Sequence, residues 1–466
     1  MVMKIMVIGC GSVGAYAISN LLDKGHKVLA VDAKPEALIG LERKTQNRVK
    51  KLLCVPEGKP EVADFLRNYS AGCDVIALAV PGDFGYNYLK LLIEHTAVKR
   101  IVDVSFSPEN SFALNELAKE RGKTVLVDCG LAPGLNDMLL GDAFHFFGDK
   151  MHTTSSESGA LEVAGGKKFR FAPADDLELY TRDVNFRQNG IKRTLPGLLR
   201  SNPVDLSEFS ARLPQVLTDQ PVAFLTDCIR TSETEFPNVL NMTEKTIRYG
   251  STFRQLDFLK RQGFFYKGFG HKEFSLRPHE TARDFTDRVM SASEASDYEY
   301  NGPSGASPHL LGPDGYAQEM TNEEYAYTSV LGPLGFVDAD IPLGLNGSFY
   351  PFDVTLKLLE KVWTPGPSDR DCTVMRVYAT GEYLGNEQQI VYSMCVPYDH
   401  NYDMSSLAKG TGAPFVAGVE LLLSGLCTET GILGPGYVGK NVDYMQFIQN
   451  SLQKQRFSYI KRVIKL

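Results

Sequence analysis

Residues 4–14 read Lys-Ile-Met-Val-Ile-Gly-Cys-Gly-Ser-Val-Gly, and residues 27–32 read Lys-Val-Leu-Ala-Val-Asp. The first stretch has the form of an apolar strand that enters a Gly-x-Gly-x-x-Gly turn and then opens a helix. The second has the form of another strand, and it ends in an acidic residue, Asp32. A glycine motif alone is weak evidence. With a strand before it, a helix after it and an acid closing the next strand, it predicts a dinucleotide-binding βαβ unit.

Each residue type in this motif has a physical role. Gly9 allows the tight turn, Gly11 lets the backbone approach a pyrophosphate, and Gly14 lets the helix pack closely on the strand. The helix begins at Ser12, where free N–H groups and the positive end of the helix dipole favour phosphates. The predicted cofactor-binding residues of this unit are Gly9, Gly11, Ser12, Val13, Gly14 and Asp32.

The acid at the end of the second strand indicates which dinucleotide is bound. A carboxylate at Asp32 can accept hydrogen bonds from both ribose hydroxyls of an adenosine, and it would repel a 2′-phosphate. We therefore expect NAD as the cofactor, with NADP less favoured. Lys34, two residues further on, is basic and weakens the expected preference for NAD over NADP.

The overall composition is that of a globular protein. The chain has 466 residues, of which 43% are hydrophobic and 23% charged, and this length suggests two or three domains. Its net charge of −7 argues against nucleic acid as a partner. The eight cysteines form no C-x-x-C pair and the histidines show no metal-ligand spacing. We therefore expect reduced thiols and no metal site.

The two ends of the chain support expectations about location. The N-terminus leads directly into the first strand, without the form of a signal peptide, and the most apolar late segment is too short to span a bilayer. We expect a cytoplasmic protein with no membrane partner. Residues 454–466 interleave basic and apolar side chains at helical spacing, which favours an amphipathic helix that packs on the protein.

The first 140 residues alternate regularly between strands and helices. Six strands with helices between them predict a doubly wound parallel α/β sheet of the Rossmann type. After these strands the alternation stops, and residues 150–265 mix short strands with polar loops, which suggests an α+β second domain. The six strands are expected near residues 4–9, 27–32, 51–55, 73–79, 99–104 and 124–128.

The rest of the chain divides into a loop-rich segment and a regular one. Residues 266–350 are rich in Gly, Pro, Ser and Tyr, and loops of that length are usually functional lids or mobile segments. The later residues predict a helix over 353–362, a hairpin of 373–379 with 389–396, and a helix within 405–426.

Several short motifs follow one another in a specific order. They are residues 103–106 (Asp-Val-Ser-Phe), 128–134 (Asp-Cys-Gly-Leu-Ala-Pro-Gly), 159–161 (Gly-Ala-Leu), 171–173 with 180–182, 226–231, 244–249 and 408–414. On these motifs the chain resembles the saccharopine dehydrogenase family, and most closely its lysine 6-dehydrogenase branch. The resemblance covers nearly all of the chain except residues 266–350.

This resemblance implies an architecture and an activity. Enzymes of the family oxidise or form carbon–nitrogen bonds on lysine or its adducts with a nicotinamide cofactor. Residues 1–140 and 405–466 would then form the dinucleotide-binding domain, because the C-terminal helices of the family pack back on it. Residues 141–404 would form the domain for substrate binding and dimerisation, with 266–350 as an unusually long insertion, and the protein would be a homodimer.

Candidate catalytic residues lie where strands of the first domain end, because ligands of open α/β sheets bind beyond those ends. Asp103 ends the fifth strand, where it has either a site role or a structural hydrogen-bonding role. Cys129 follows the sixth strand beside a helix start that would lower its thiol pKa; alternatively it is a small residue that fits tightly. Tyr86 either contacts the ligand or packs in the core. Ala79, Val80 and Pro81 end the fourth strand and should wall the nicotinamide half of the cofactor.

Candidate substrate-binding residues lie in the second domain. An arginine fork binds a carboxylate through two hydrogen bonds, which suits an amino-acid substrate. Arg230 with Thr231, and Arg248 with Tyr249, are the best such clamps, and either arginine could instead form an interdomain ion pair. Gly159, from the Gly-Ala-Leu motif, completes the predicted set.

We interpret the chain as an NAD-dependent oxidoreductase that acts on the C–N bond of lysine or a lysine adduct. One alternative is a saccharopine or carboxynorspermidine-type reductase, which joins an amine to a carbonyl compound and reduces the product. Another is a catalytically silent NAD-binding sensor that keeps the fold.

Overall fold

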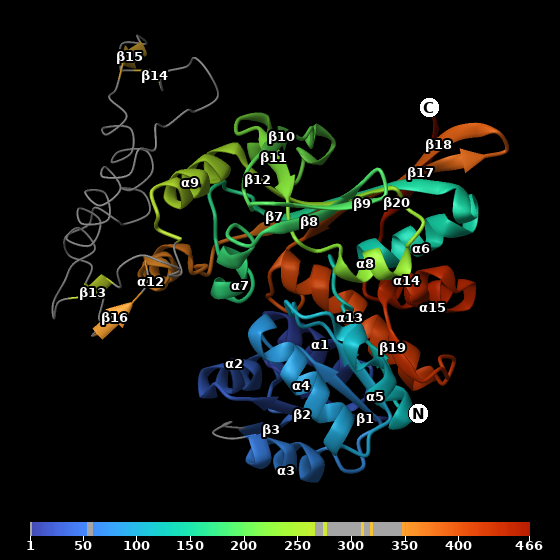
Figure 1. The fold of residues 1–466 in the computed structure, drawn as a ribbon. Helices are drawn as coiled ribbons and strands as arrows, with labels where there is room; N and C mark the ends of the chain where they lie inside the picture. Colours follow the sequence, from blue (N-terminus) through green and yellow to red (C-terminus); the bar gives the residue numbers. More distant parts are fainter. Residues whose placement is uncertain are drawn as a thin grey trace.

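A seven-stranded parallel sheet forms the first half of the molecule. The computed structural model describes residues 2–53, 59–265, 274–276, 309–311, 317–319, 347–349 and 351–466. The sheet has the strand order β19-β6-β5-β4-β1-β2-β3 and lies in the lower part of Figure 1. Its strands are β1 (Lys4–Ile8), β2 (Lys27–Asp32), β3 (Lys50–Leu53), β4 (Val75–Leu78), β5 (Arg100–Asp103), β6 (Thr124–Leu126) and β19 (Gly431–Leu433).

The order of the first six strands is that of a doubly wound Rossmann sheet, which confirms the predicted fold class. The central strands are apolar because helices cover both faces, and all four residues of β4 are buried. The seventh strand, β19, has no clear signal in the sequence, since it is three residues long and pairs with β6 from far along the chain. The helical elements of this part are α1 (Ser12–Asp23), α2 (Pro35–Thr45), α3 (Lys59–Tyr69), α4 (Gly82–His95), η1 (Ser111–Leu114), α5 (Asn115–Glu120), α6 (Leu135–Phe147) and η2 (Gly148–Lys150).

A larger mixed sheet forms the second half, as the sequence predicts for an α+β domain. Its path is β10-β11-β12-β7-β17-β18-β20, with β8 paired to both β12 and β9. Strand β12 runs parallel to β7, and the long hairpin of β17 and β18 is antiparallel. Its strands are β7 (Met151–Glu162), β8 (Val184–Gln188), β9 (Ile191–Leu195), β10 (Ser201–Pro203), β11 (Pro221–Leu225), β12 (Asn241–Tyr249), β17 (Asp371–Tyr383), β18 (Asn386–Pro397) and β20 (Ile460–Lys465).

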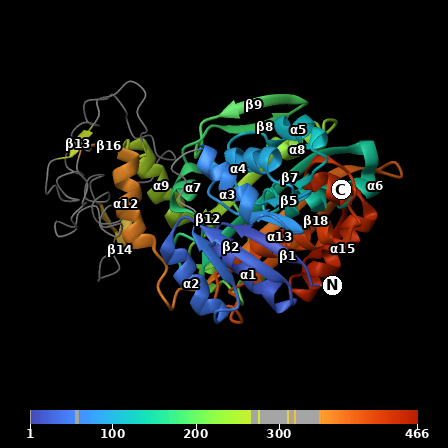
Figure 2. The same cartoon turned by 90° about the horizontal axis from the view of Figure 1, so that it is seen from below.

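Helices of this half pack on the second sheet, and two of them form a separate apolar cluster. Figure 2 shows α9 and α12 side by side, and their buried leucines pack together with Phe264, Phe352 and Trp363. The helical elements are α7 (Pro173–Glu178), η3 (Ser207–Phe209), η4 (Pro214–Leu217), α8 (Arg230–Glu235), α9 (Gly250–Arg261), α12 (Pro351–Trp363), α13 (Ser406–Ser424), α14 (Pro435–Lys440) and α15 (Val442–Lys454).

Helix α13 lies between the two sheets and contacts α1, β5 and β17 (Figure 1). Small residues permit this close approach. A Cβ at Gly412 would lie 2.5 Å from the ring of Tyr16, and one at Gly418 would lie 2.5 Å from the sulfur of Cys129. The helix therefore binds the C-terminal part of the chain to the first sheet while it supports the second.

The C-terminal tail differs from its prediction. The amphipathic helix expected over 454–466 is wrong, because α15 ends at Lys454 and residues 460–465 form β20 at the edge of the second sheet. The β-branched residues Ile460, Val463 and Ile464 favour an extended chain, and β18 offers a free strand edge for pairing. The expected domain boundary placed this tail with the first sheet, whereas β20 belongs to the second.

The predictions for residues 266–350 lie outside the described residues, apart from four strands of three residues. These strands form two separate pairs, β13 (Phe274–Leu276) with β16 (Gly347–Phe349) and β14 (His309–Leu311) with β15 (Ala317–Glu319).

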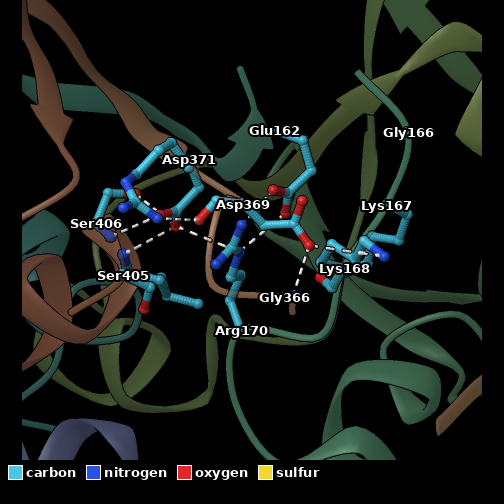
Figure 3. Close-up of polar contacts among 12 residues, drawn as sticks. Glu162, Gly166, Lys167, Lys168, Arg170, Gly366, Asp369, Asp371, Ser405 and Ser406 are labelled. Atoms are coloured by element: carbon cyan, nitrogen blue, oxygen red, sulfur yellow. Dashed lines mark hydrogen bonds and ion pairs between the residues drawn. The ribbon is translucent and has the colours of Figure 1, made fainter. Parts of the chain in front are cut away.

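A buried ion cluster joins the start of β17 to the segment after β7 (Figure 3). Arg170 donates from Nε to Glu162 at 2.9 Å, forms a further contact with the same carboxylate through Nη2, and lies 3.7 Å from Asp371. Asp371 also accepts hydrogen bonds from the N–H and hydroxyl of Ser406, at 2.8 and 2.7 Å, at the start of α13. The same arginine therefore holds the loop after β7 against the N-terminus of α13.

Replacing Arg170 should destabilise the fold strongly. We expect Arg170→Met to lower the free energy of unfolding by roughly 3–5 kcal/mol, since it leaves Glu162 and Asp371 buried without a counter-charge. Denaturant titration followed by far-UV circular dichroism would measure this loss.

The matched control is Lys168→Met. Lys168 and Asp369 lie 3.7 Å apart with about 29% of each side chain exposed, so this pair should contribute about 0–1 kcal/mol. Equal losses in the two variants would contradict the structural role given to Arg170.

Candidate active site

A cavity of about 680 Å³ lies between the two sheets. Its walls come from the carboxyl ends of the first-sheet strands, from β7 and β12 of the second sheet, and from the segment between β7 and α7. All the predicted cofactor-binding residues line this cavity: Gly9, Gly11, Ser12, Val13, Gly14, Asp32, Ala79, Val80 and Pro81. The structure thus brings the glycine motif and the end of β4 together, as ligand binding would require.

The glycine turn is shaped by backbone contacts that leave no room for side chains. Gly9 has a φ of +96°, and a Cβ there would lie 2.1 Å from the carbonyl oxygen of Ala79. A Cβ at Gly14 would lie 1.9 Å from the oxygen of Gly9, whereas one at Gly11 would meet nothing within 4 Å. Gly9 and Gly14 therefore serve packing, and Gly11 faces open space through which a ligand can approach.

The start of α1 and the end of β2 complete a cradle that fits a dinucleotide. Helix α1 begins after Gly11 without any side-chain cap, so its first N–H groups are open to a phosphate. The carboxylate of Asp32 accepts from the N–H of Cys10 at 2.6 Å and from that of Lys34 at 2.7 Å. These bonds fix the carboxylate at the cavity wall, where its remaining lone pairs can accept from ribose hydroxyls.

The second half of the molecule closes over this cradle. Ser12 donates its hydroxyl to the carbonyl oxygen of Arg170 at 3.3 Å. The N–H of Gly82, which begins α4, donates to the carboxylate of Asp175 at 3.2 Å. Both contacts come from the segment after β7, so the cofactor end and the second-sheet end belong to one continuous cavity.

Of the two carboxylates near the ends of β5 and β6, Asp128 lines the cavity and Asp103 does not. Asp103 is buried and accepts from the N–H of Ser105 at 2.8 Å, and burial raises its pKa to about 7. Asp128 is held by the hydroxyl of Thr231 and lies 3.6 Å from Arg230. The site role of Asp103 stays a prediction, and of the two carboxylates only Asp128 reaches the cavity wall.

The thiol of Cys129 does not have the lowered pKa that its place before a helix suggests. Burial raises its pKa to about 12, and the carboxylates of Asp103 and Asp128 add to the rise. The thiol is 1% exposed, and it donates to the carbonyl of Pro414 at 3.6 Å. The expected lowering of the thiol pKa is therefore wrong, because burial and the two carboxylates raise it, and the geometry favours tight packing. A catalytic role for Cys129 stays a prediction.

The third predicted catalytic residue, Tyr86, packs among the apolar side chains on the outer face of the first sheet. Its helical neighbours Phe84 and Tyr88 line the cavity instead. A direct role for Tyr86 stays a prediction that the geometry does not support.

The predicted substrate clamps have internal partners. Arg230 and Thr231 both bind Asp128, and the guanidinium of Arg230 lies 5.1 Å from the ring centre of Phe106. Tyr249 donates its hydroxyl to the carbonyl of Glu162 at 2.8 Å, away from the cavity. Gly159 lines the cavity, and its lack of a side chain is required by β12, because a Cβ would lie 2.3 Å from the oxygen of Ile247.

Arg248 does line the cavity, but its fork already has partners. It donates to the hydroxyl of Tyr180 at 2.8 Å and to Asp176 at 3.2 Å. The ammonium of Lys167 also binds Asp176, so two cations share one carboxylate while Lys167 is protonated. Burial lowers the pKa of Lys167 to about 8, against the opposing charge of Asp176. This wall of the cavity therefore carries a surplus of positive charge.

Several polar and charged residues of the cavity are not among the predicted site residues, and Glu244, Thr246 and Lys167 are three of them. Thr246 and Glu244 lie two and four residues before Arg248, and alternate residues of a strand share one face. That period could have placed them beside Arg248. Lys167 gives no such signal, because it lies in a loop that reaches the cavity only through the fold.

Within the part of the chain that the structure describes, no group of three or more His, Cys, Asp or Glu side chains is arranged to hold a metal ion. No helix among the described residues is long and apolar enough to cross a membrane.

The different environments of the thiols give a direct test of this site. At neutral pH we expect iodoacetamide to alkylate Cys395 in the native protein and to leave Cys129 unmodified. The sulfurs of Cys395 and Cys372 lie 3.6 Å apart, and the hydrogen bond between them lowers the pKa of Cys395 to about 7, whereas Cys129 is buried. Peptide mass spectrometry would measure both, with denatured protein as the control for reactivity. Equal labelling of the two thiols in native protein would contradict the packing described for Cys129.

Comparison with known proteins agrees with this architecture. The family model described as the saccharopine dehydrogenase C-terminal domain matches residues 130–456. A saccharopine dehydrogenase [NADP(+), L-glutamate-forming] of Pyricularia oryzae is 21% identical over 451 residues, which cover 93% of each chain. The solved apo saccharopine dehydrogenase (L-Glu forming) of Saccharomyces cerevisiae has the same fold, with a TM-score of 0.71, 16% identity and 100% of both chains covered. The chain therefore belongs to the saccharopine dehydrogenase family of oxidoreductases.

Proposed function

We propose that this protein is a nicotinamide-dependent oxidoreductase that acts on the C–N bond of lysine or a lysine adduct, as in the lysine 6-dehydrogenase branch. The observation that carries the proposal is the continuity of the cavity: the glycine cradle and Asp32 open into a chamber walled by charged side chains of β12. A bound nicotinamide would supply the hydride acceptor or donor. The chain itself would bind, orient and deprotonate the substrate.

The wall near Lys167 and Arg248 suits the carboxylate of an amino acid. Asp176 is the carboxylate that both cations contact, so an incoming anion would neutralise the remaining positive charge. Phe169 and Trp363 lie under the ammonium of Lys167, with ring centres at 5.7 and 5.9 Å, and Phe169 gives that end of the chamber an apolar surface. Substrate recognition by Arg248 would thus be shared with Lys167.

We further propose NAD as the cofactor. The fixed carboxylate of Asp32 lies where the adenosine ribose would lie, and a 2′-phosphate would meet its negative charge. Lys34 is the basic residue beside it on the cavity wall. The relative from Pyricularia oryzae is named for NADP, so the choice depends on this local balance of charges.

Cofactor preference should change when Asp32 is replaced. We expect the unaltered protein to bind NAD about ten-fold more tightly than NADP, a difference of about 1.4 kcal/mol, and Asp32→Ala to narrow that gap. Isothermal titration calorimetry with each nucleotide would measure both affinities. Tighter binding of NADP by the unaltered protein would overturn the proposal and make Lys34 the phosphate ligand.

The reaction itself is tested by following reduced cofactor in the presence of amino acids and polyamines. The proposal predicts reduction of NAD with lysine. Reduction with saccharopine but not with lysine would favour the second candidate, a saccharopine-forming reductase, which the names of both relatives support. Tight nucleotide binding with no turnover on any amine would indicate the silent sensor.

A homodimer and a cytoplasmic location remain proposals. The edge strand β20 supports the first, because Ile460 and Val463 on it are 57% and 52% exposed, and apolar side chains on an open sheet edge are usually covered by another chain.

A further inference from the structure

Three carboxyl groups meet at the end of the cavity where β6, α6 and β12 come together. Glu244 lines the cavity from β12, is 4% exposed, and accepts from the amide of Asn136 at 3.2 Å. Asp128 lines the same end from the loop after β6. Asp137, on α6, is fully buried behind them and accepts from the hydroxyl of Ser232 at 2.5 Å.

This group of acids lacks a matching positive charge. Among the described residues, the cation beside these three acids is Arg230. Its guanidinium lies 3.6 Å from the carboxylate of Asp128, and it also acts on Glu244. The second oxygen of Asp137 has no hydrogen-bond partner although it is fully buried. Buried charges are ordinarily paired, so the arrangement is incomplete until a positive group enters the cavity or a proton is bound.

The remaining groups around Glu244 are consistent with this imbalance. Burial raises the pKa of Glu244 well above its ordinary value, with further contributions from Asp137 and Asp128 that outweigh Arg230. Burial likewise raises the pKa of Asp137 to about 7. Cys228 lies beside Glu244, and burial raises the pKa of its thiol, so it supplies no charge near neutral pH.

We propose that Glu244 and Asp128 form the subsite for the substrate's ammonium group, with Glu244 as its proton acceptor and Asp137 as a positioning residue. This inference rests on the proposed function for the identity of the substrate. In the proton step an N–H bond of the ammonium breaks, its proton goes to the carboxylate of Glu244, and the nitrogen keeps the electron pair as a neutral amine. Asp137 acts through its charge, which makes Glu244 a stronger base.

The position of the subsite fits this assignment. Asp128 follows β6, where ligands of open α/β sheets bind. Glu244 and Arg248 share one face of β12 and are about 13 Å apart along the strand. A substrate with a carboxylate and a distal amine could therefore lie between the cationic wall at Arg248 and the acidic end at Glu244.

Binding of a charged and an uncharged probe of equal length would test the subsite without turnover. We expect n-pentylamine to bind the unaltered protein about ten-fold more tightly than 1-pentanol at mildly alkaline pH, measured by ligand-observed NMR titration. Glu244→Gln should abolish that preference while it leaves 1-pentanol and nucleotide binding unchanged. Equal binding of both probes by the unaltered protein, or a preference retained in Glu244→Gln, would overturn the inference.

The matched control is Glu157→Gln. Glu157 lies on the neighbouring strand β7, is also buried, and pairs with Lys245 at 3.1 Å on the opposite face from Glu244. It does not line the cavity, so this variant should keep the preference for n-pentylamine. Loss of the preference in both variants would mean that the sheet, and not the subsite, had been disturbed.

Asp137→Asn provides a second test, of the positioning role of Asp137. This test does not depend on whether the Glu244→Gln variant folds. Glu244 must be ionised to bind an ammonium, so affinity for n-pentylamine should rise with pH as Glu244 loses its proton. Without the negative charge of Asp137, Glu244 should ionise more readily, and the rise should move to lower pH. An unchanged pH profile would overturn the positioning role.

These results are separable from the test of the proposed function. Charge-dependent binding at Glu244 in a protein that fails to oxidise lysine would leave the subsite standing and remove the proposed substrate. Lysine oxidation that survives in Glu244→Gln with an unaltered preference for n-pentylamine would leave the function standing and remove the subsite.

Discussion

The cofactor end of this molecule depends on a backbone contact between two strands of the first sheet. The carbonyl oxygen of Ala79 lies where the Cβ of a side chain at residue 9 would project. In the same way, the carbonyl oxygen of Gly9 lies where a Cβ at residue 14 would project. These contacts press the loop, the end of β4 and the start of α1 together. Gly11 and the open N–H groups of α1 then face the cavity. Any side chain at Gly9 or Gly14 would force the loop away from β4 and remove the cradle.

The second sheet completes the chamber through a segment that would have little stability alone. The loop after β7 contributes Lys167, Phe169 and Arg170 to the wall, and the ion cluster with Glu162 and Asp371 fixes its path. Since Asp371 also binds the start of α13, the same cluster relates the loop to the helix between the sheets (Figure 3). The geometry of the cavity is therefore coupled to a buried polar network as well as to apolar packing.

Charge is distributed unevenly along the chamber. Lys167 and Arg248 outnumber their carboxylate partner at one side, and acids outnumber Arg230 at the other. In a buried site of low polarity, such imbalances raise or lower proton affinity and favour ligands of the opposite charge. A molecule with a carboxylate at one end and an amine at the other would complement both. The same burial raises the pKa of the Cys129 thiol.

The sequence by itself determined the elements whose signal is local. The glycine motif with Asp32, the apolar parallel strands and the hairpin of β17 and β18 could all be predicted, because spacing and period express backbone geometry directly. The tertiary structure decided what depends on partners far along the chain. It placed residues 460–465 in β20 because β18 had a free edge. It also gave Arg248 the partners Asp176 and Tyr180, and it brought Glu244 and Asp128 to the same cavity. Pairing, burial and net charge at a site are sums over distant residues, and no local pattern in the chain reports them.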